Sequence, residues 1–211
     1  MKEQGVLAVV SGFSGAGKGT IMKALLEKYD NYALSISATT RSPRPGEVDG
    51  REYFFMTNEQ FEELIEKNRL IEYARYVNHY YGTPSSYVEE MMARGKDVIL
   101  EIEIQGALKV KEKYPEAVLI FVVPPAAADL KARLLGRGTE TEEVIEKRLK
   151  RALEESEGME SYDYILVNDT IETCVEELHG LIRSQHLKAC RNQERISRMK
   201  KELRELVESG R

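Results

Sequence analysis

Short apolar runs alternate with segments of helical periodicity along most of the chain. Four runs rich in Val, Ile and Leu predict buried strands, and they span residues 6–10, 98–102, 117–123 and 164–167. After the first run, Ile21, Leu25 and Leu26 recur at the spacing of a helix face. Buried strands separated by helices predict an α/β fold, with a parallel sheet covered by helices on both faces.

Two intervals depart from this alternation. Residues 37–86 contain RSPRPGEVDG and closely spaced aromatic residues, a pattern that predicts a small insertion with its own hairpins. Residues 130–157 are dense in charge around LLGRGTETEE, where Thr139 or Thr141 is suited to cap a following helix. We expect these intervals to form two flaps over one site, the second of them a helical lid.

The last 29 residues have a pattern of their own. Ile196, Met199, Leu203 and Leu206 follow a heptad-like spacing, although Gln185 and Asn192 interrupt it earlier. We expect residues 183–211 to form a long helix that packs on the core of its own chain. A helix between subunits is the alternative, so the sequence leaves a monomer and a homo-oligomer both open.

Composition narrows the class of protein. The 211 residues are 42 % hydrophobic and 32 % charged, as in a globular protein of one domain with insertions. The net charge is -5, but residues 183–211 hold 9 Lys/Arg and 4 Asp/Glu, a balance of +5 that leaves -10 for the remainder. An acidic body disfavours binding to nucleic acid. No apolar run suits a signal peptide or a membrane span, so we expect a cytoplasmic protein without a membrane partner.

The stretch VVSGFSGAGKGT, residues 9–20, carries the first candidate chemistry. Gly12, Gly17 and Lys18 have the spacing of a phosphate-binding loop, and the loop lies between a predicted strand and a predicted helix. Gly19 stands where that pattern has a hydroxyl for magnesium, and Thr20 is about 100° further round the helix. We therefore expect a loop that holds a nucleotide, with Mg²⁺ relying more on the phosphates and water.

Several further motifs make a resemblance to guanylate kinases specific. They are SISATTRSPRPGEVDGREYFF, IEYARYVNHYYGTPSSYV, ILEIEIQGALKV, GRGTETEEVIEKRL and VND, which together with the loop span residues 5–182. The chain resembles that family in the order and spacing of the motifs. The resemblance implies the three-layer core of P-loop NTPases, a GMP-binding insertion at about 37–86, a lid at about 130–157, and an extension at 183–211 beyond the domain.

The resemblance also implies a reaction and its participants. Guanylate kinases transfer the γ-phosphoryl group of ATP to GMP, giving ADP and GDP with Mg²⁺ as cofactor. No motif obviously contacts the 2′-hydroxyl of the acceptor, so dGMP is expected as a second acceptor. The implied ATP-binding residues are Ser14, Gly15, Ala16, Gly17, Lys18, Gly19, Thr20 and Asn168.

The implied acceptor site combines cations, hydroxyls and a carboxylate. Its residues are Ser37, Arg41, Arg44, Tyr53, Glu72, Tyr81, Thr83 and Glu103. Guanidinium groups suit a phosphate dianion, and a carboxylate suits the N1 and N2 donors of guanine. Glu101 and Glu103 stand where the family has paired aspartates. By resemblance, Glu103 contacts guanine N2 and Glu101, with Thr20, serves Mg²⁺ through water.

The remaining implied catalytic residues are cations that stabilise charge on the transferred group. They are Lys18, Arg41, Arg133, Arg137 and Arg148. Phosphoryl transfer relies on positioning and electrostatics, so converging cations are the machinery that it needs. The neighbouring lid cations Lys131, Lys147, Lys150 and Arg151 are expected to be ordinary surface residues.

Two other functions fit parts of this pattern. Some scaffold proteins carry guanylate-kinase-like domains that bind phosphorylated peptides without catalysis, but Lys18 and the lid arginines favour an enzyme. A kinase for another phosphorylated acceptor is the second alternative. Glu72 with Ser37 and Thr83 favours guanine over that alternative.

Overall fold

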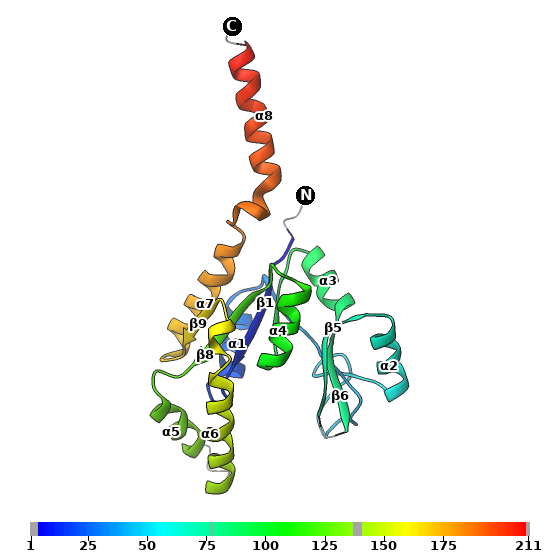
Figure 1. Cartoon of the computed structure of the whole chain (residues 1–211), viewed down its shortest axis with the longest axis vertical. Coiled ribbons are helices and arrows are strands. Elements are labelled where there is room, and N and C mark those ends of the chain that lie inside the picture. The colour runs from blue at the N-terminus through cyan, green and yellow to red at the C-terminus, as the bar shows by residue number, and fades with distance from the viewer. Residues whose placement is uncertain (1–3, 77, 137–140, 210–211) are drawn as a thin grey trace.

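A computed structural model describes residues 4–76, 78–136 and 141–209 of the chain. Figure 1 shows a central body from which two parts project at one end, with a single helix, α8, projecting at the other. Arg137 and Thr139, both named above, lie outside the described residues. Within the described ranges, each helix is too short or too polar to cross a membrane.

The body contains a five-stranded parallel sheet with the order β2-β7-β1-β8-β9. Its strands are β1 (Leu7–Gly12), β2 (Tyr32–Leu34), β7 (Asp97–Glu101), β8 (Val118–Val123) and β9 (Tyr164–Val167). The four predicted strands are confirmed within two residues at each end. The edge strand β2 was not predicted, because its three residues form too short an apolar run for the pattern to distinguish.

Helices cover both faces of this sheet. α1 (Lys18–Lys28) and α7 (Ile171–Gln185) pack on one face, and α3 (Ser85–Ala93) and α4 (Ile104–Lys113) pack on the other. The central strand β1 serves both layers, because successive side chains of a strand point to opposite faces. Ala8 and Val10 join the cluster under α1 and α7, and Leu7 and Val9 join the cluster under α3 and α4.

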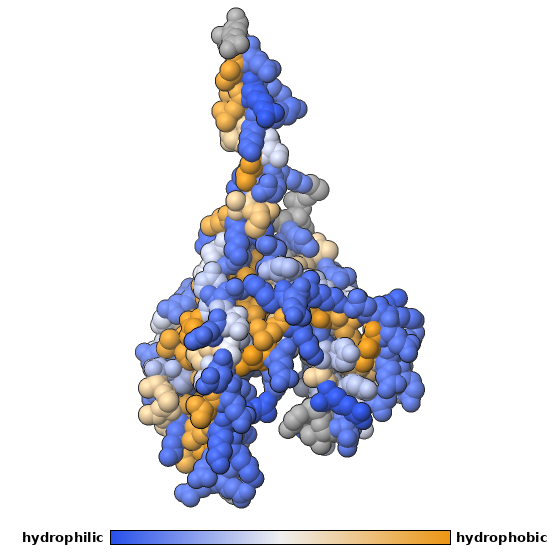
Figure 2. All heavy atoms as spheres, in the orientation of Figure 1, coloured by the Kyte–Doolittle hydropathy of each residue, from blue (hydrophilic) through white to orange (hydrophobic). Residues whose placement is uncertain are grey.

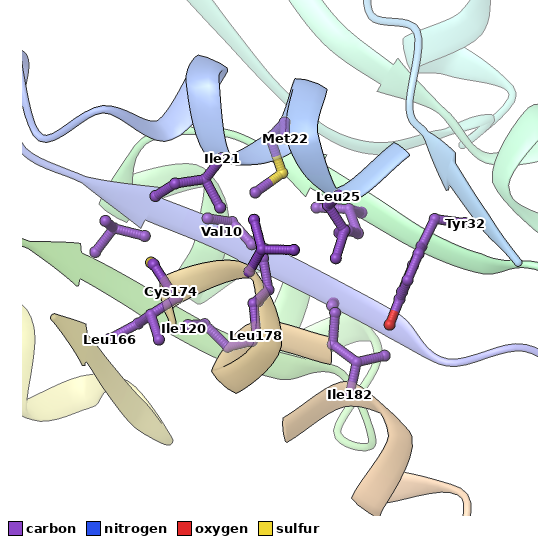
Figure 3. Packing of buried hydrophobic residues seen from close by; sticks show 14 of the residues in the cluster. Val10, Ile21, Met22, Leu25, Tyr32, Ile120, Leu166, Cys174, Leu178 and Ile182 are labelled. Atoms are coloured by element: carbon purple, nitrogen blue, oxygen red, sulfur yellow. The ribbon is translucent and has the colours of Figure 1, made fainter. Parts of the chain in front are cut away.

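The first of these clusters is fully enclosed. Figure 3 shows Ile21, Met22 and Leu25 of α1 beside Leu178 and Ile182 of α7 on one face of the sheet, and each of the five is at most 1 % exposed. The predicted three-layer α/β architecture is therefore confirmed.

A second, four-stranded sheet occupies the interval that we predicted to be an insertion. Its order is β4-β3-β6-β5, and its strands are β3 (Ala38–Thr39), β4 (Phe54–Phe55), β5 (Leu70–Tyr76) and β6 (His79–Pro84). α2 (Asn58–Glu66) begins with a capping box between Thr57 and Gln60. Phe61 of this helix, Ala38 and Leu70 form a small separate core.

Two helices form the other projecting part. α5 (Ala127–Gly136) and α6 (Glu142–Ser156) enclose their own apolar cluster of Leu130, Leu134, Ile145 and Ala152. The cluster contacts the body through Phe13, which follows β1 directly. Thr141, one of the two predicted alternatives, stands at the N-cap position of α6, but its side chain makes no cap hydrogen bond.

The C-terminal segment differs from the prediction. The 3₁₀ helix η1 (Met159–Ser161) lies between α6 and β9, whereas η2 (Ala189–Asn192) follows α7 and precedes α8 (Gln193–Ser209). α8 has no buried residue and extends away from the body (Figures 1 and 2). The helix begins at Gln193 instead of residue 183, and the predicted packing on the core was wrong for α8, because none of its residues is buried.

The two polar residues that interrupt the apolar pattern lie at the end of α7 and just before α8. Gln185 is buried at the end of α7, where its amide donates to the Leu181 carbonyl at 2.9 Å. The Asn192 amide donates to the carbonyls of His186 (2.7 Å) and Lys188 (2.9 Å). α7 ends at His186 in tight backbone bonds to carbonyls three residues earlier, and the Asn192 bonds hold the turn that leads into α8.

We predict that deleting residues 193–211 leaves thermal stability nearly unchanged, with a Tm shift below about 2 °C. The physical reason is that none of the described α8 side chains is buried. Thermal unfolding monitored by circular dichroism measures this shift. Leu178→Ala is the contrasting variant, because it removes a fully buried side chain and should cost about 2–5 kcal/mol. A large Tm loss on deletion would mean that α8 covers apolar surface in solution.

Candidate active site

The phosphate-binding loop joins β1 to α1 at the carboxyl end of the sheet. Gly12 (φ 153°) and Gly17 (φ 93°) have backbone angles that suit glycine. A Cβ atom would lie 2.3 Å from the Val122 carbonyl oxygen at Gly12 and 2.4 Å from the Asn168 amide nitrogen at Gly17. Any side chain at these two positions would push the loop off the sheet. The glycine spacing therefore reflects close packing beneath the loop.

Asn168 supports the loop from below. Its side-chain amide donates to the Ala16 carbonyl at 2.7 Å, and the residue is only 2 % exposed. The Arg133 guanidinium donates to the carbonyl oxygens of Asn168 (2.7 Å) and Ala16 (3.4 Å). Both residues were predicted to contact ATP or the transferred group. In the structure they brace the backbone of the loop, and neither is among the described residues that line the adjoining cavity.

Lys18 begins α1 and folds back over its own loop. Its ammonium group donates to the carbonyl oxygens of Gly12 (2.6 Å) and Phe13 (3.3 Å). Burial lowers the pKa of Lys18, and the negative charges of Glu101, Glu155 and Glu103 oppose that effect. The ammonium group thus lies over the carbonyl groups of its own loop and beside the cavity that Lys18 lines.

A cavity of about 580 Å³ opens in front of this loop. It is lined by Gly12, Ser14, Lys18, Glu101, Ile102, Glu103, Val144, Lys147, Arg148, Arg151 and Glu155. The structure thus brings the loop together with the carboxyl end of β7 and with one face of α6. Arg148 donates to the Ser14 hydroxyl, so this predicted lid cation contacts the loop directly.

Two cations of this cavity were missed by the sequence analysis. Lys147 and Arg151 line it, although we expected both to be ordinary surface residues. They lie one residue before and three residues after Arg148, spacings that leave all three on one broad face of α6. Both are surface residues, with side chains 71 % exposed for Lys147 and 46 % for Arg151, but a charge-rich helix has no apolar stripe to show which charged face turns toward a cavity.

Gly19 and Thr20 lie at the rim of the loop. A Cβ atom on Gly19 would meet no heavy atom within 4 Å, so this glycine is not required by packing. Thr20 is exposed in the first turn of α1 and is absent from the described lining of the cavity. Glu101 faces the cavity instead, where burial raises the pKa of its carboxyl group and the Lys18 charge opposes the rise.

A second cavity, of about 570 Å³, lies between the central sheet and the second sheet. Its lining includes Ser37, Tyr53, Glu72 and Tyr81, four residues predicted to bind the acceptor. It shares Glu101, Ile102, Glu103 and Arg151 with the first cavity. Figure 2 shows the molecule hollowed between α6 and the second sheet, where the two cavities meet. They are neighbours separated by a single wall.

The carboxyl group of Glu72 is the most enclosed acid in the second cavity. Glu72 is 9 % exposed, and it accepts a hydrogen bond of 2.8 Å from the hydroxyl of Thr83, which is fully buried. The pairing of β5 with β6 is irregular between Leu70 and Tyr73, and such an irregularity redirects a side chain. Burial raises the pKa of Glu72, whereas the Thr83 hydrogen bond lowers it.

Arg41 is held by a residue that the sequence analysis did not single out. Its guanidinium makes a two-bond pair with the Glu47 carboxylate (2.6 and 2.7 Å) and lies 4.9 Å from the centre of the Tyr53 ring. Hydrogen bonds from Arg41 and from the Arg44 backbone lower the pKa of Glu47 to about 2. Arg41 and Arg44 are absent from the described lining of the cavity, and Arg44 is exposed.

We predict that Glu72→Gln stabilises the free protein, and more so as the pH rises. The raised pKa means that charging Glu72 costs more in the folded than in the unfolded chain. The stability of the wild type relative to the variant is therefore greatest below the pKa that Glu72 has in the unfolded chain. It falls as the pH rises through the pKa that Glu72 has in the folded chain. By pH 8 the variant should melt about 2–4 °C higher, the shift that 1 kcal/mol produces in a protein of this size.

Thermal melts of both proteins from pH 4 to pH 8 provide the measurement. Glu66→Gln, on the exposed surface of α2, is the matched control and should follow the wild type throughout. A difference between Glu72→Gln and wild type that stays constant over this range would contradict the prediction.

Known proteins resemble this chain over most of its length. The guanylate kinase family model matches residues 4–185, ending at the last residue of α7. A guanylate kinase of Oceanobacillus iheyensis is 51 % identical over 210 residues, covering 100 % of this chain and 98 % of the relative. One of Bacillus subtilis is 49 % identical over 94 % of this chain and 98 % of its own.

A solved structure is also similar. The crystal structure of guanylate kinase from Anaplasma phagocytophilum has a TM-score of 0.69 and 34 % sequence identity, and the match covers 90 % of each chain. The resemblance inferred from the motifs is therefore confirmed, and the chain belongs to the guanylate kinase family.

Proposed function

We propose that the two adjoining cavities hold the two substrates of the guanylate kinase reaction. The chain is an ATP:GMP phosphotransferase, which gives ADP and GDP. The single observation that supports this assignment of cavities is their common wall, formed by Glu101, Ile102, Glu103 and Arg151. Direct transfer requires donor and acceptor phosphates in contact, and two cavities with one wall allow that contact.

ATP occupies the cavity at the phosphate loop. The glycine backbone and the N-terminus of α1 supply donors for the phosphates, and Lys18 supplies a full positive charge. The triphosphate binds along the loop segment from Ser14 to Thr20. Asn168 donates a hydrogen bond to the Ala16 carbonyl and so fixes the backbone of this loop, which is its contribution to ATP binding.

GMP occupies the cavity beside the second sheet. Glu72 accepts hydrogen bonds from the base while Thr83 holds its carboxylate, and Ser37 adds a hydroxyl at the same end. Tyr53 and Tyr81, with ring centres 6.2 Å apart, donate to the acceptor phosphate. Arg41 and Arg44 pair with that phosphate when it arrives, and Arg41 is held ready beside Tyr53 by Glu47. Recognition of base and phosphate leaves the 2′-position free, so dGMP is a second acceptor.

The lid provides charge stabilisation during transfer. Arg148 reaches the loop through Ser14, and Arg133 fixes the loop backbone through Ala16 and Asn168. Arg137 is the third lid arginine of the predicted set and lies outside the described residues. Negative charge spreads over the equatorial oxygens of the transferred group, where cations lower the barrier without a general base.

A magnesium ion fits the carboxylate side of the ATP cavity. Mg²⁺ prefers oxygen ligands and retains water, and Glu101 offers a carboxylate there opposite the phosphate loop. Thr20, exposed outside the described lining, fits such a role less well. When bound, the ion neutralises phosphate charge and aligns the terminal phosphate. A cytoplasmic location follows from the requirement for ATP as donor.

A coupled assay of ADP formation tests this proposal. With ATP and Mg²⁺, we expect turnover with GMP and dGMP but little with AMP, CMP or UMP. Lys18→Ala should lower kcat by at least about 100-fold, because it removes a charge that acts on the transferred group.

Lys23→Ala is the matched control, because Lys23 lies on α1 with its side chain 79 % exposed. It should behave as wild type. Binding of GMP without any turnover would instead favour a non-catalytic binding module, and turnover with a different acceptor would move the assignment of Glu72.

A further inference from the structure

Arg151 of α6 occupies a place that the proposed reaction does not explain. It lies on the wall of the ATP cavity and on the wall of the GMP cavity. Among the described lining residues, the others that the two cavities share come from the single segment Glu101–Ile102–Glu103 at the end of β7. Arg151 is thus a lid residue that reaches the acceptor side.

Hydrogen bonds to two described residues, Glu155 and Glu103, direct its side chain. The Nε atom donates to Glu155 Oε1 at 3.0 Å, four residues further along the same helix. The Nη2 atom donates to Glu103 Oε1 at 2.6 Å, across the gap between α6 and the body. Glu155 therefore orients Arg151 along α6, and Arg151 in turn holds the carboxylate of Glu103.

Glu103 needs such a restraint. It stands at the N-cap position of α4 without a side-chain cap bond, and its side chain is 76 % exposed. An exposed glutamate loses rotamer entropy when it is fixed for ligand binding, which costs affinity unless the side chain is held beforehand. A carboxylate has several acceptor positions on its two oxygens, so the bond from Arg151 leaves capacity for a ligand.

We propose that Arg151 is a positioning residue that holds Glu103 for the 2-amino group of the guanine base, so that the lid helix contributes to base selectivity. The inference rests on the proposed function, with GMP in the cavity that Glu103 lines, and on the contact of Glu103 with guanine N2 that the resemblance implies. Guanine and hypoxanthine differ only by that amino group. The contribution of Arg151 is therefore specific to GMP and absent for IMP, which carries hypoxanthine on the same ribose phosphate.

Two other roles for Arg151 predict different behaviour. A cation that only neutralises the transferred phosphoryl group would affect kcat equally for GMP and IMP, because their phosphates are identical. A residue that only fixes the lid to the body would change both acceptors and the thermal stability together. Selective weakening of GMP binding distinguishes the positioning role from both.

The test compares GMP and IMP as acceptors for wild type, Arg151→Ala, Arg151→Lys and Glu103→Gln. We expect Arg151→Ala to raise KM for GMP about tenfold, the size expected when a charged hydrogen-bonding group loses its position. KM for IMP should change less than about twofold by the same reasoning. Calorimetric Kd values for both nucleotides serve where turnover of IMP is too slow to measure.

Three further results belong to the same experiment. Arg151→Lys should recover part of the GMP affinity, because an ammonium still pairs with Glu103 but does not span to Glu155 as well. Adding Arg151→Ala to Glu103→Gln should raise KM for GMP no further. Lys131→Ala, on the exposed surface of α5, is the matched control and should leave both acceptors unchanged.

Equal changes for GMP and IMP, or an additive double variant, would overturn the positioning role. Thermal melts of each variant identify a loss caused by unfolding, which Arg151, 46 % exposed, is not expected to produce. Failure of the proposed function has a different signature, since wild-type protein would then show no turnover with GMP at all.

Discussion

Repulsion between two phosphate-bearing ligands is the constraint around which this molecule is arranged. A nucleoside triphosphate and a nucleoside monophosphate must touch, so positive charge has to reach the contact from several directions. Under the proposed function, Lys18 comes from the body, Arg148 comes from α6, and Arg41 comes from the segment between β3 and β4 of the second sheet. No single element of secondary structure provides that geometry. The two projecting parts of the fold bring cations to the site from directions that the body alone does not cover.

In the ligand-free protein, basic side chains of the site lie beside acidic ones. Arg41 pairs with Glu47, Arg151 pairs with Glu103 and Glu155, and the negative charges near Lys18 oppose the effect of its burial. Such pairs add little stability at exposed sites. Their value lies in fixing long side chains in one direction, so that less entropy is lost when a phosphate arrives.

Burial of charge at the site also has a thermodynamic cost. Burial raises the pKa of Glu72 and lowers the pKa of Lys18. In each residue, burial therefore favours the neutral form of the side chain. The large apolar clusters under α1 and α7 and under α3 and α4 supply the stability that offsets this cost. The extended α8 adds nothing to them, because none of its described side chains is buried.

The sequence by itself determined the parallel sheet, the phosphate loop and the family. Strand runs and glycine spacing are local patterns, and each constrains the backbone without reference to distant residues. Only the tertiary structure decided which charged residues of α6 face the cavities, that Glu47 holds Arg41, that Asn168 lies beneath Ala16, and that α8 leaves the body. These depend on contacts between residues far apart in the chain or on the direction of a turn, and a polar residue carries no local sign of which partner it will meet.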